Sequence, residues 1–196
     1  MNKYAHLISR SLALAAVLLL AACAGQPAKE SSAKATAGAS LRAEDQAAWQ
    51  SSMQLIKQQK WAEAKNALTP LAKNNPQFPG VLINLAAVNC QLQQWQEAAA
   101  LLKRLPNAEQ SPQALNLMGV VAEHSGQITQ AEQYYLSAVN NPAAPAEAQY
   151  NLALLYDIYW QDPLKALPYY EAYARARPED KAVSDWITEI KRKAKR

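Results

Sequence analysis

The sequence predicts an all-α protein of about four consecutive helical hairpins followed by one more helix. Four similar segments recur at a nearly constant spacing, and apolar residues on both sides of them follow the i, i+3, i+4 spacing of a helix. Pro76, Pro142 and Pro178 follow three of the segments, where a proline would end a second helix. The final alanines of the segments lie 34, 33 and 35 residues apart in Lys60–Ala64, Gln94–Ala98, Gln127–Ala131 and Asp162–Ala166.

This period resembles the tetratricopeptide repeat (TPR), a 34-residue helix–turn–helix unit. In that family, small residues let the paired helices approach, large residues fill the space between them, and a proline ends the second helix. The resemblance covers about residues 45–178. It implies a right-handed superhelix whose concave face is lined by the first helix of each repeat. We therefore assign residues 44–178 to TPR-like repeats.

The family's small and large positions can be matched in this chain. The small position of the first helix holds Ala86, Gly119 and Ala153 in the later repeats, and Ser51-Ser52 in the first. The large position of the second helix, four residues after the repeated alanine, holds Leu68, Leu102, Tyr135 and Tyr170. Two departures are visible. Pro106 should end the second helix of the second repeat early, and the fourth repeat has one extra residue, which we place in its turn around Trp160–Asp162.

Residues 179–196 are predicted to form a capping helix with a basic tail. A stack of repeats exposes an apolar face at its end, and a terminal amphipathic helix covers that face. Acidic residues in the first turn and basic residues in the last turn suit the helix dipole. The apolar residues with helical spacing are Ala182, Val183, Trp186, Ile187 and Ile190.

Residues 1–22 have the pattern of an export signal peptide. Lys3 and Arg10 precede an apolar run from Leu12 to Ala22, which is shorter than the roughly 20 residues that span a bilayer. The run ends in Leu20-Ala21-Ala22-Cys23, which resembles the bacterial lipobox. This resemblance implies that Cys23 becomes the N-terminus and carries acyl chains; the alternative is an ordinary signal peptide whose cleavage site contains a cysteine.

The residues that follow Cys23 predict where the protein is located and where its linker lies. Ala24 stands after the cysteine instead of Asp, which by resemblance to enterobacterial sorting favours the outer membrane. We expect a lipid-anchored protein whose domain faces the periplasm. Residues 23–43 are then the lipidated cysteine and a flexible linker, because they contain no large apolar residue before Leu41.

The charge distribution argues against nucleic-acid binding. The formal net charge is +4 and falls to +2 when the signal peptide, with Lys3 and Arg10, is removed. Five further positive charges lie in the last six residues, 191–196, so the rest of the chain is slightly acidic. A uniformly basic surface is therefore absent.

The residues offer little for catalysis, and we expect no enzyme activity, metal or cofactor. Beyond the signal peptide there is one histidine, His124, at the expected end of a helix. Cys90 falls on the apolar side of its helix, where a free thiol behaves as a small hydrophobic residue. Phosphate-binding loops and nucleophile motifs are also missing from the sequence.

Recognition of a protein partner, as a peptide or helix in the concave groove, is the class that remains. The predicted groove residues are Trp49, Met53, Ile83, Asn84, Asn116, Val120, Tyr150, Asn151, Leu154 and Asp157. Asn84 and Asn151 share a repeat position and can bond a peptide backbone, while Tyr150 and Trp49 are aromatic anchors. The alternative is that some of these residues pack against neighbouring helices. Some members of the family bind a partner's C-terminal carboxylate with cationic side chains of the groove. We do not expect this mode here, because the matching positions of this chain carry no cation.

The expected function is that of a membrane-anchored periplasmic scaffold. Lipoproteins of this design resemble accessory factors of envelope machines: pilus or secretin assembly, outer-membrane assembly, regulation of cell-wall enzymes, or TonB-type systems. A rival is a lipoprotein that binds peptidoglycan or lipopolysaccharide, or assembles with itself, through its basic tail. The sequence leaves the partner and the oligomeric state open.

Overall fold

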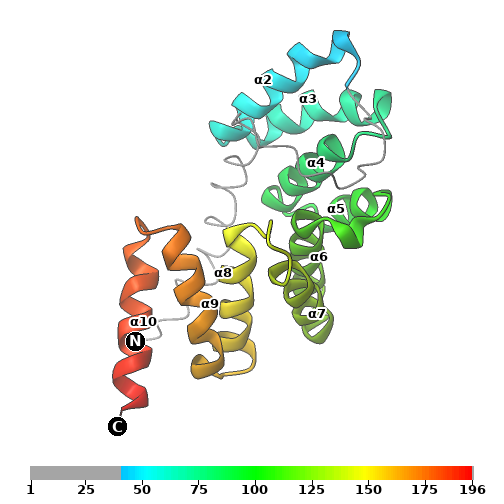
Figure 1. Ribbon diagram of the computed structural model, residues 1–196. Helices are drawn as coiled ribbons and strands as arrows, with labels where there is room; N and C mark the ends of the chain where they lie inside the picture. Colours follow the sequence, from blue (N-terminus) through cyan, green and yellow to red (C-terminus); the bar gives the residue numbers. More distant parts are fainter. Residues whose placement is uncertain (1–40, 196) are drawn as a thin grey trace. The chain divides into compact units, whose positions relative to one another are not determined.

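The computed structural model describes residues 41–195, which form α-helices joined by short turns and contain no strand (Figure 1). Contacts divide the chain into two compact units that meet in sequence between Pro106 and Asn107. The predicted signal peptide, the predicted acylation site Cys23 and the predicted linker up to residue 40 lie outside the described residues, as does Arg196.

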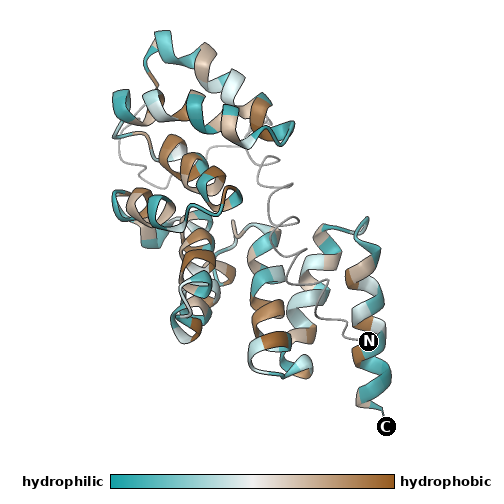
Figure 2. Cartoon of the chain, turned by 180° about the vertical axis from the view of Figure 1, so that it is seen from behind, coloured by the Kyte–Doolittle hydropathy of each residue, from teal (hydrophilic) through white to brown (hydrophobic). Residues whose placement is uncertain are grey.

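The N-terminal unit contains two hairpins. The short 3-10 helix η1 (Ala43–Asp45) leads into α2 (Gln46–Lys57), which pairs with α3 (Trp61–Asn74), and α4 (Pro79–Gln91) pairs with α5 (Trp95–Lys103). Helix α4 is hydrophobic over most of its length (Figure 2) and packs on both α3 and α5. Helix α5 stops at Lys103; the early end that Pro106 predicts is confirmed.

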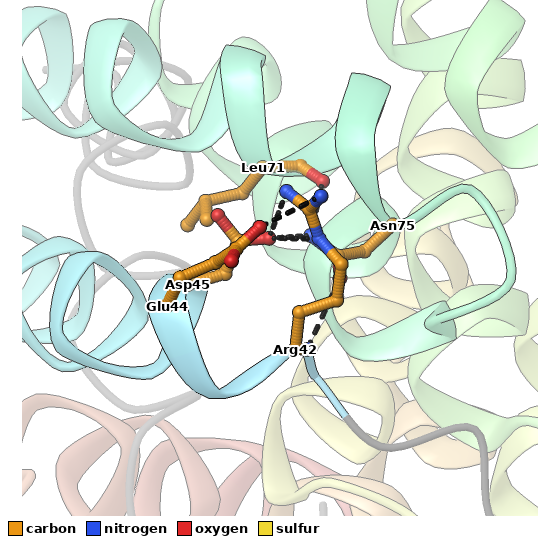
Figure 3. A network of polar contacts seen from close by, with 5 residues as sticks. All are labelled: Arg42, Glu44, Asp45, Leu71 and Asn75. Carbon is orange, nitrogen blue, oxygen red and sulfur yellow. Dashed lines mark hydrogen bonds and ion pairs between the residues drawn. The ribbon is translucent and has the colours of Figure 1, made fainter.

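A polar network joins the start of the described chain to the first hairpin (Figure 3). Asp45 Oδ2 accepts hydrogen bonds from Asn75 Nδ2 at 2.8 Å and from Arg42 Nη2 at 2.7 Å. These bonds hold the pKa of Asp45 below its ordinary value, that from Asn75 having the larger effect. Arg42 and Ala43, at the end of the predicted linker, take part in this network and in η1, respectively.

The C-terminal unit contains two more hairpins and the final helix. After η2 (Ala108–Gln110), α6 (Pro112–His124) pairs with α7 (Ile128–Val139). The next hairpin consists of α8 (Ala146–Leu154), its π-helical continuation η3 (Leu155–Tyr159), and α9 (Pro163–Ala176). Helix α10 (Lys181–Ala194) packs on α9, so that α8, α9 and α10 lie side by side (Figure 1).

The turn inside each hairpin has the same geometry. Its middle residue has a positive φ: 57° at Gln59, 58° at Gln93, 74° at Gly126 and 52° at Gln161. In the first three turns, the following N–H donates to a carbonyl five residues back, as in a Schellman motif. In the fourth, Asp162 N donates to Tyr156 O, six residues back, at 2.8 Å.

The extra residue of the fourth repeat therefore lies in the first helix and not in the turn, which corrects our placement around Trp160–Asp162. The turn itself has the ordinary three residues, and the inserted residue is accommodated in the π-helical segment Leu155–Tyr159. A π turn takes up one additional residue because its hydrogen bonds run from i to i+5. The spacing of 35 residues alone cannot distinguish these two placements.

The predicted all-α fold of four TPR-like hairpins with a C-terminal helix is confirmed. Helices α3, α7 and α9 end at Asn74, Val139 and Ala176, two or three residues before their prolines. In α10, Val183 and Ile190 are buried, and the Trp186 ring lies 5.8 Å from that of Tyr170. This contact covers the apolar side of α9.

Candidate binding surface

The small and large positions of the repeats meet in the third hairpin. A Cβ atom added at Gly119 would lie 2.4 Å from Tyr135 Cε1, so only glycine leaves room for this tyrosine ring. The second repeat has Ala86 and Leu102 at the matching positions, both buried. In the third hairpin, the larger residue on the second helix thus goes together with a smaller one on the first, whereas the fourth combines Ala153 with Tyr170.

Four residues beyond the small position, the two units differ in chemistry. The N-terminal unit has Ile56 and Cys90 there, whereas the C-terminal unit has Glu123 and Asp157. Tyr135 OH donates to Glu123 Oε2 at 2.9 Å, and Tyr170 OH donates to Asp157 Oδ2 at 3.3 Å. Each buried tyrosine in the large position therefore has a carboxylate acceptor on its paired helix.

The Tyr159 hydroxyl of the next hairpin lies close to Glu123. Burial raises the pKa of Glu123, and the hydroxyls of Tyr135 and Tyr159 offset part of that rise. Burial, together with the nearby Glu123 carboxylate, raises the pKa of the Tyr159 hydroxyl. Two tyrosine hydroxyls thus lie near one carboxylate where the third and fourth hairpins meet.

The predicted groove residues of the N-terminal unit are partly exposed. Trp49, Met53, Ile83 and Asn84 are all half-buried. The Trp49 ring meets the edge of Phe78 with centroids 5.8 Å apart and planes at 89°. Asn84 Nδ2 donates to Gly80 O at 2.8 Å, which uses part of its donor capacity. Binding of a partner by these residues stays a prediction.

The predicted groove residues of the C-terminal unit mostly pack inside it. Tyr150 is 2% exposed, and its ring lies 4.9 Å from Tyr173 and 6.5 Å from Trp186. Asn151 Nδ2 donates to Asn116 Oδ1 at 3.0 Å between two buried side chains. Val120 is half-buried, whereas Leu154 and Asp157 are buried. In this arrangement the buried residues hold helices together, the alternative considered from the sequence, and partner contact by them stays a prediction.

The structure also contains a pocket that the sequence did not reveal. It has a volume of about 560 Å³ and lies between the end of the α8–η3 helix, the start of α9 and one face of α10. Its lining is mostly apolar with three charged side chains: Asp157, Ile158, Gln161, Pro163, Leu164, Trp186, Glu189, Ile190, Lys193 and Ala194. A pocket of this size, apolar with a few polar groups, is typical of binding sites.

Exposed hydrophobic side chains lie in the same part of the chain. Tyr159, Trp160 and Leu164 have exposed fractions of 46%, 46% and 57%. Trp160, in the turn of the fourth hairpin, is about half exposed. Among the described residues these are the large hydrophobic side chains most open to solvent, and Leu164 lines the pocket.

Two other kinds of functional feature, a metal site and a membrane-spanning helix, are not found in the described residues. Within residues 41–195, no group of three or more His, Cys, Asp and Glu side chains is arranged to hold a metal ion. In that range, too, every helix is too short or too polar to span a membrane. Cys90 is buried, and burial raises the pKa of its thiol to about 12, which disfavours the reactive thiolate.

Comparison with protein families finds a match over part of the chain. A tetratricopeptide repeat family model matches residues 55–121, from the end of α2 into α6. No curated protein sequence matches the chain. The TPR-like arrangement seen in the structure extends on both sides of the matched segment.

Solved structures of MamA share the fold. One crystal structure of MamA is 20% identical, covers 71% of this chain and 81% of its own, and gives a TM-score of 0.54. A second is 18% identical, with 74% and 80% covered and a TM-score of 0.55. MamA from Desulfovibrio magneticus RS-1, from residue 41 to its end, is 17% identical, with 78% and 96% covered and a TM-score of 0.54. At these identities the likeness concerns the fold.

Proposed function

We propose that this chain is a periplasmic scaffold that binds a protein partner and is held at the outer membrane by acyl chains on Cys23. The TPR fold is a protein–protein interaction scaffold. The observation that carries the proposal is the apolar pocket of the fourth hairpin, with Tyr159, Trp160 and Leu164 exposed beside it. Exposed apolar surface around a concave site is typical of protein-binding surfaces.

The membrane anchor rests on the sequence Leu20-Ala21-Ala22-Cys23. Two or three acyl chains anchor a protein stably, whereas one alone binds a membrane weakly and reversibly. With the anchor, the chain would hold its partner close to the membrane, as an accessory factor of an envelope machine does. Pilus or secretin assembly, outer-membrane assembly, regulation of cell-wall enzymes and TonB-type systems are the processes that such a factor would serve.

The rival function, polyanion binding through the basic tail, has less support. Lys191 Nζ lies 2.7 Å from Glu171 Oε1, and Lys193 Nζ lies 2.8 Å from Glu189 Oε1. Two of the tail's cations thus pair with carboxylates of the same unit. A tail that binds peptidoglycan or lipopolysaccharide would have to give up these ion pairs.

Photocrosslinking in cells tests the scaffold function. A photoreactive residue replaces Asn84 in the predicted groove, Leu164 at the pocket, or, as control, the exposed Asn66 on the second helix of the first hairpin. We expect a discrete protein adduct from Asn84 or Leu164 that Asn66 does not give, identified by mass spectrometry. Adducts with the chain itself only, or the same adducts from all three sites, would reject the scaffold.

The anchor needs its own test. Replacing Cys23 by Ser should abolish metabolic labelling with palmitate and release the chain from the membrane pellet. The matched control is Cys90→Ser, which removes the other cysteine of the chain and should leave both readouts unchanged. Palmitate labelling that survives Cys23→Ser would contradict the assignment.

A further inference from the structure

Glu123 and Asp157 occupy equivalent positions but have different neighbours. Glu123 accepts a hydrogen bond from Tyr135 OH of its own hairpin, and the Tyr159 hydroxyl of the following hairpin lies close to it. Asp157 receives the equivalent hydroxyl of its own hairpin, from Tyr170, on Oδ2. Among the described residues, α10, which follows the fourth hairpin, supplies no second donor to Asp157.

Asp157 lines the pocket and is only 9% exposed. In residues 41–195, the hydrogen-bond donor to its carboxylate is Tyr170 OH. A buried carboxylate is stabilised by a cation or by further hydrogen-bond donors. The one lysine that lines the pocket, Lys193, is paired with Glu189, and in residues 41–195 no lysine or arginine forms an ion pair with Asp157. The pocket therefore has one uncompensated negative charge.

The walls around this charge are apolar. Ile158, Leu164 and Ile190 line the pocket together with the Trp186 indole. An occupant must therefore combine a cationic group with hydrocarbon. Arginine and lysine do so within one side chain, because their charged ends are carried on aliphatic stems.

We propose that this pocket binds an arginine or lysine side chain of the protein partner, with the cation on Asp157 and a neighbouring branched aliphatic residue on Leu164 and Trp186. The inference rests on the proposed scaffold function and specifies the chemistry of the partner. It also distinguishes the fourth hairpin from the third: the Tyr159 hydroxyl lies near Glu123 in the third, whereas Asp157 of the fourth lines the pocket.

A random heptapeptide phage library tests this specificity on three full-length baits. They are the unmodified chain, Asp157→Asn, and Glu123→Gln as the matched control. Each variant keeps an acceptor oxygen and removes one charge, at equivalent positions of adjacent hairpins. Thermal unfolding of each bait checks that it is folded. Peptides enriched on the unmodified chain are then synthesised for binding measurements.

We expect enriched peptides to carry Arg or Lys next to Ile, Leu or Val. Their affinity should fall roughly tenfold or more with Asp157→Asn and stay unchanged with Glu123→Gln. In fluorine NMR of the 5-fluorotryptophan-labelled chain, they should shift Trp186 and leave Trp49 in place. No enrichment of basic peptides, equal affinity for Asp157→Asn, or an unmoved Trp186 would overturn the inference. So would a dimer that Leu164→Asp dissociates, since the pocket would then be an interface between copies.

Crosslinking from Asn84 tests the scaffold function independently of the specificity of the pocket. Partner adducts at Asn84 without selection of basic peptides would reject the pocket's specificity and leave the scaffold in place. Selection of basic peptides without any partner adduct in cells would retain the pocket and reject the scaffold role. Failure of both would reject both.

Discussion

The two units of the chain fill the same repeat positions with different chemistry. Residues 41–106 contain no tyrosine, whereas residues 107–196 contain eight of the nine tyrosines of the chain. The large position of the second helix is leucine in the N-terminal unit and tyrosine in the C-terminal unit. Each of these tyrosines donates to a carboxylate, Tyr135 to Glu123 and Tyr170 to Asp157. A repeat thus accepts a polar core residue when its paired helix supplies the acceptor.

Because of this difference, the packing of the C-terminal unit should be more sensitive to substitution than that of the N-terminal unit. An aliphatic pair is satisfied by contact alone and tolerates changes of shape, whereas a buried hydroxyl or carboxylate loses a hydrogen bond when either partner is removed. The C-terminal unit also contains a buried ion pair, Arg177 Nη2 with Glu147 Oε1 at 3.2 Å. The ion pair of the N-terminal unit around Arg42 is more exposed.

The buried ion pair should give the largest difference between the units. Arg177→Met leaves the Glu147 carboxylate buried without its cation, which costs about 3–5 kcal/mol in comparable proteins. Arg42→Met, in the exposed pair, should change the free energy of unfolding far less. Urea unfolding of both variants measures the contrast, and equal losses would show that the two pairs contribute alike.

The packing of the third hairpin should give the next largest effect. Gly119→Ala places a methyl group against the Tyr135 ring and should destabilise the chain by about 1–3 kcal/mol. Tyr135→Leu in the same chain should recover part of this loss, since Ala86 and Leu102 coexist in the second hairpin. A double-mutant cycle in urea measures the coupling. Additive losses would mean that the ring and the methyl group do not meet.

Substitutions in the hairpin turns of the two units should change the stability by smaller amounts. Gly126→Ala should cost about 1 kcal/mol, because an L-residue at φ 74° is strained and an added Cβ meets nothing within 4 Å that could compensate. Gln93→Gly, at the matching turn of the N-terminal unit, should be neutral or slightly stabilising. Differential scanning calorimetry of the two variants reads the sign of each change, and a stabilising Gly126→Ala would contradict the strain.

The smallest expected effect concerns pH. Because the pKa of Glu123 is raised in the folded chain, folding favours the protonated form, and the penalty for burying the charge appears as pH rises above the unfolded pKa. Glu123→Gln should therefore stabilise the chain at pH 7 relative to the native carboxylate, with the gain shrinking toward pH 4. Melting temperatures across this range test the trend, and a gain that grows toward acid pH would give the wrong sign.

The sequence predicts the hairpins well because their determinants are local and repeated. The alanine period, the small and large positions and Pro106 all act within one repeat. The pocket depends instead on where α10 lies against α9, which no short-range pattern specifies. Asp157 shows the same limit, since its position in the first helix is apparent from the sequence but its burial is not. Tyr150 is a further example: the sequence predicts that it contacts a partner, but its ring packs against Tyr173 of α9 and Trp186 of α10, and the position of α10 cannot be read from a local pattern.

The π turn at Leu155–Tyr159 changes the direction of side chains without changing the repeat. An added helical residue rotates all that follow it by about 100° about the helix axis. The turn Trp160–Asp162 and the packing alanine Ala166 keep their usual roles, so the rotation is absorbed before the next helix begins. One inserted residue therefore gives the fourth hairpin a first helix that differs from those of the other hairpins, while its turn and its packing alanine keep their places.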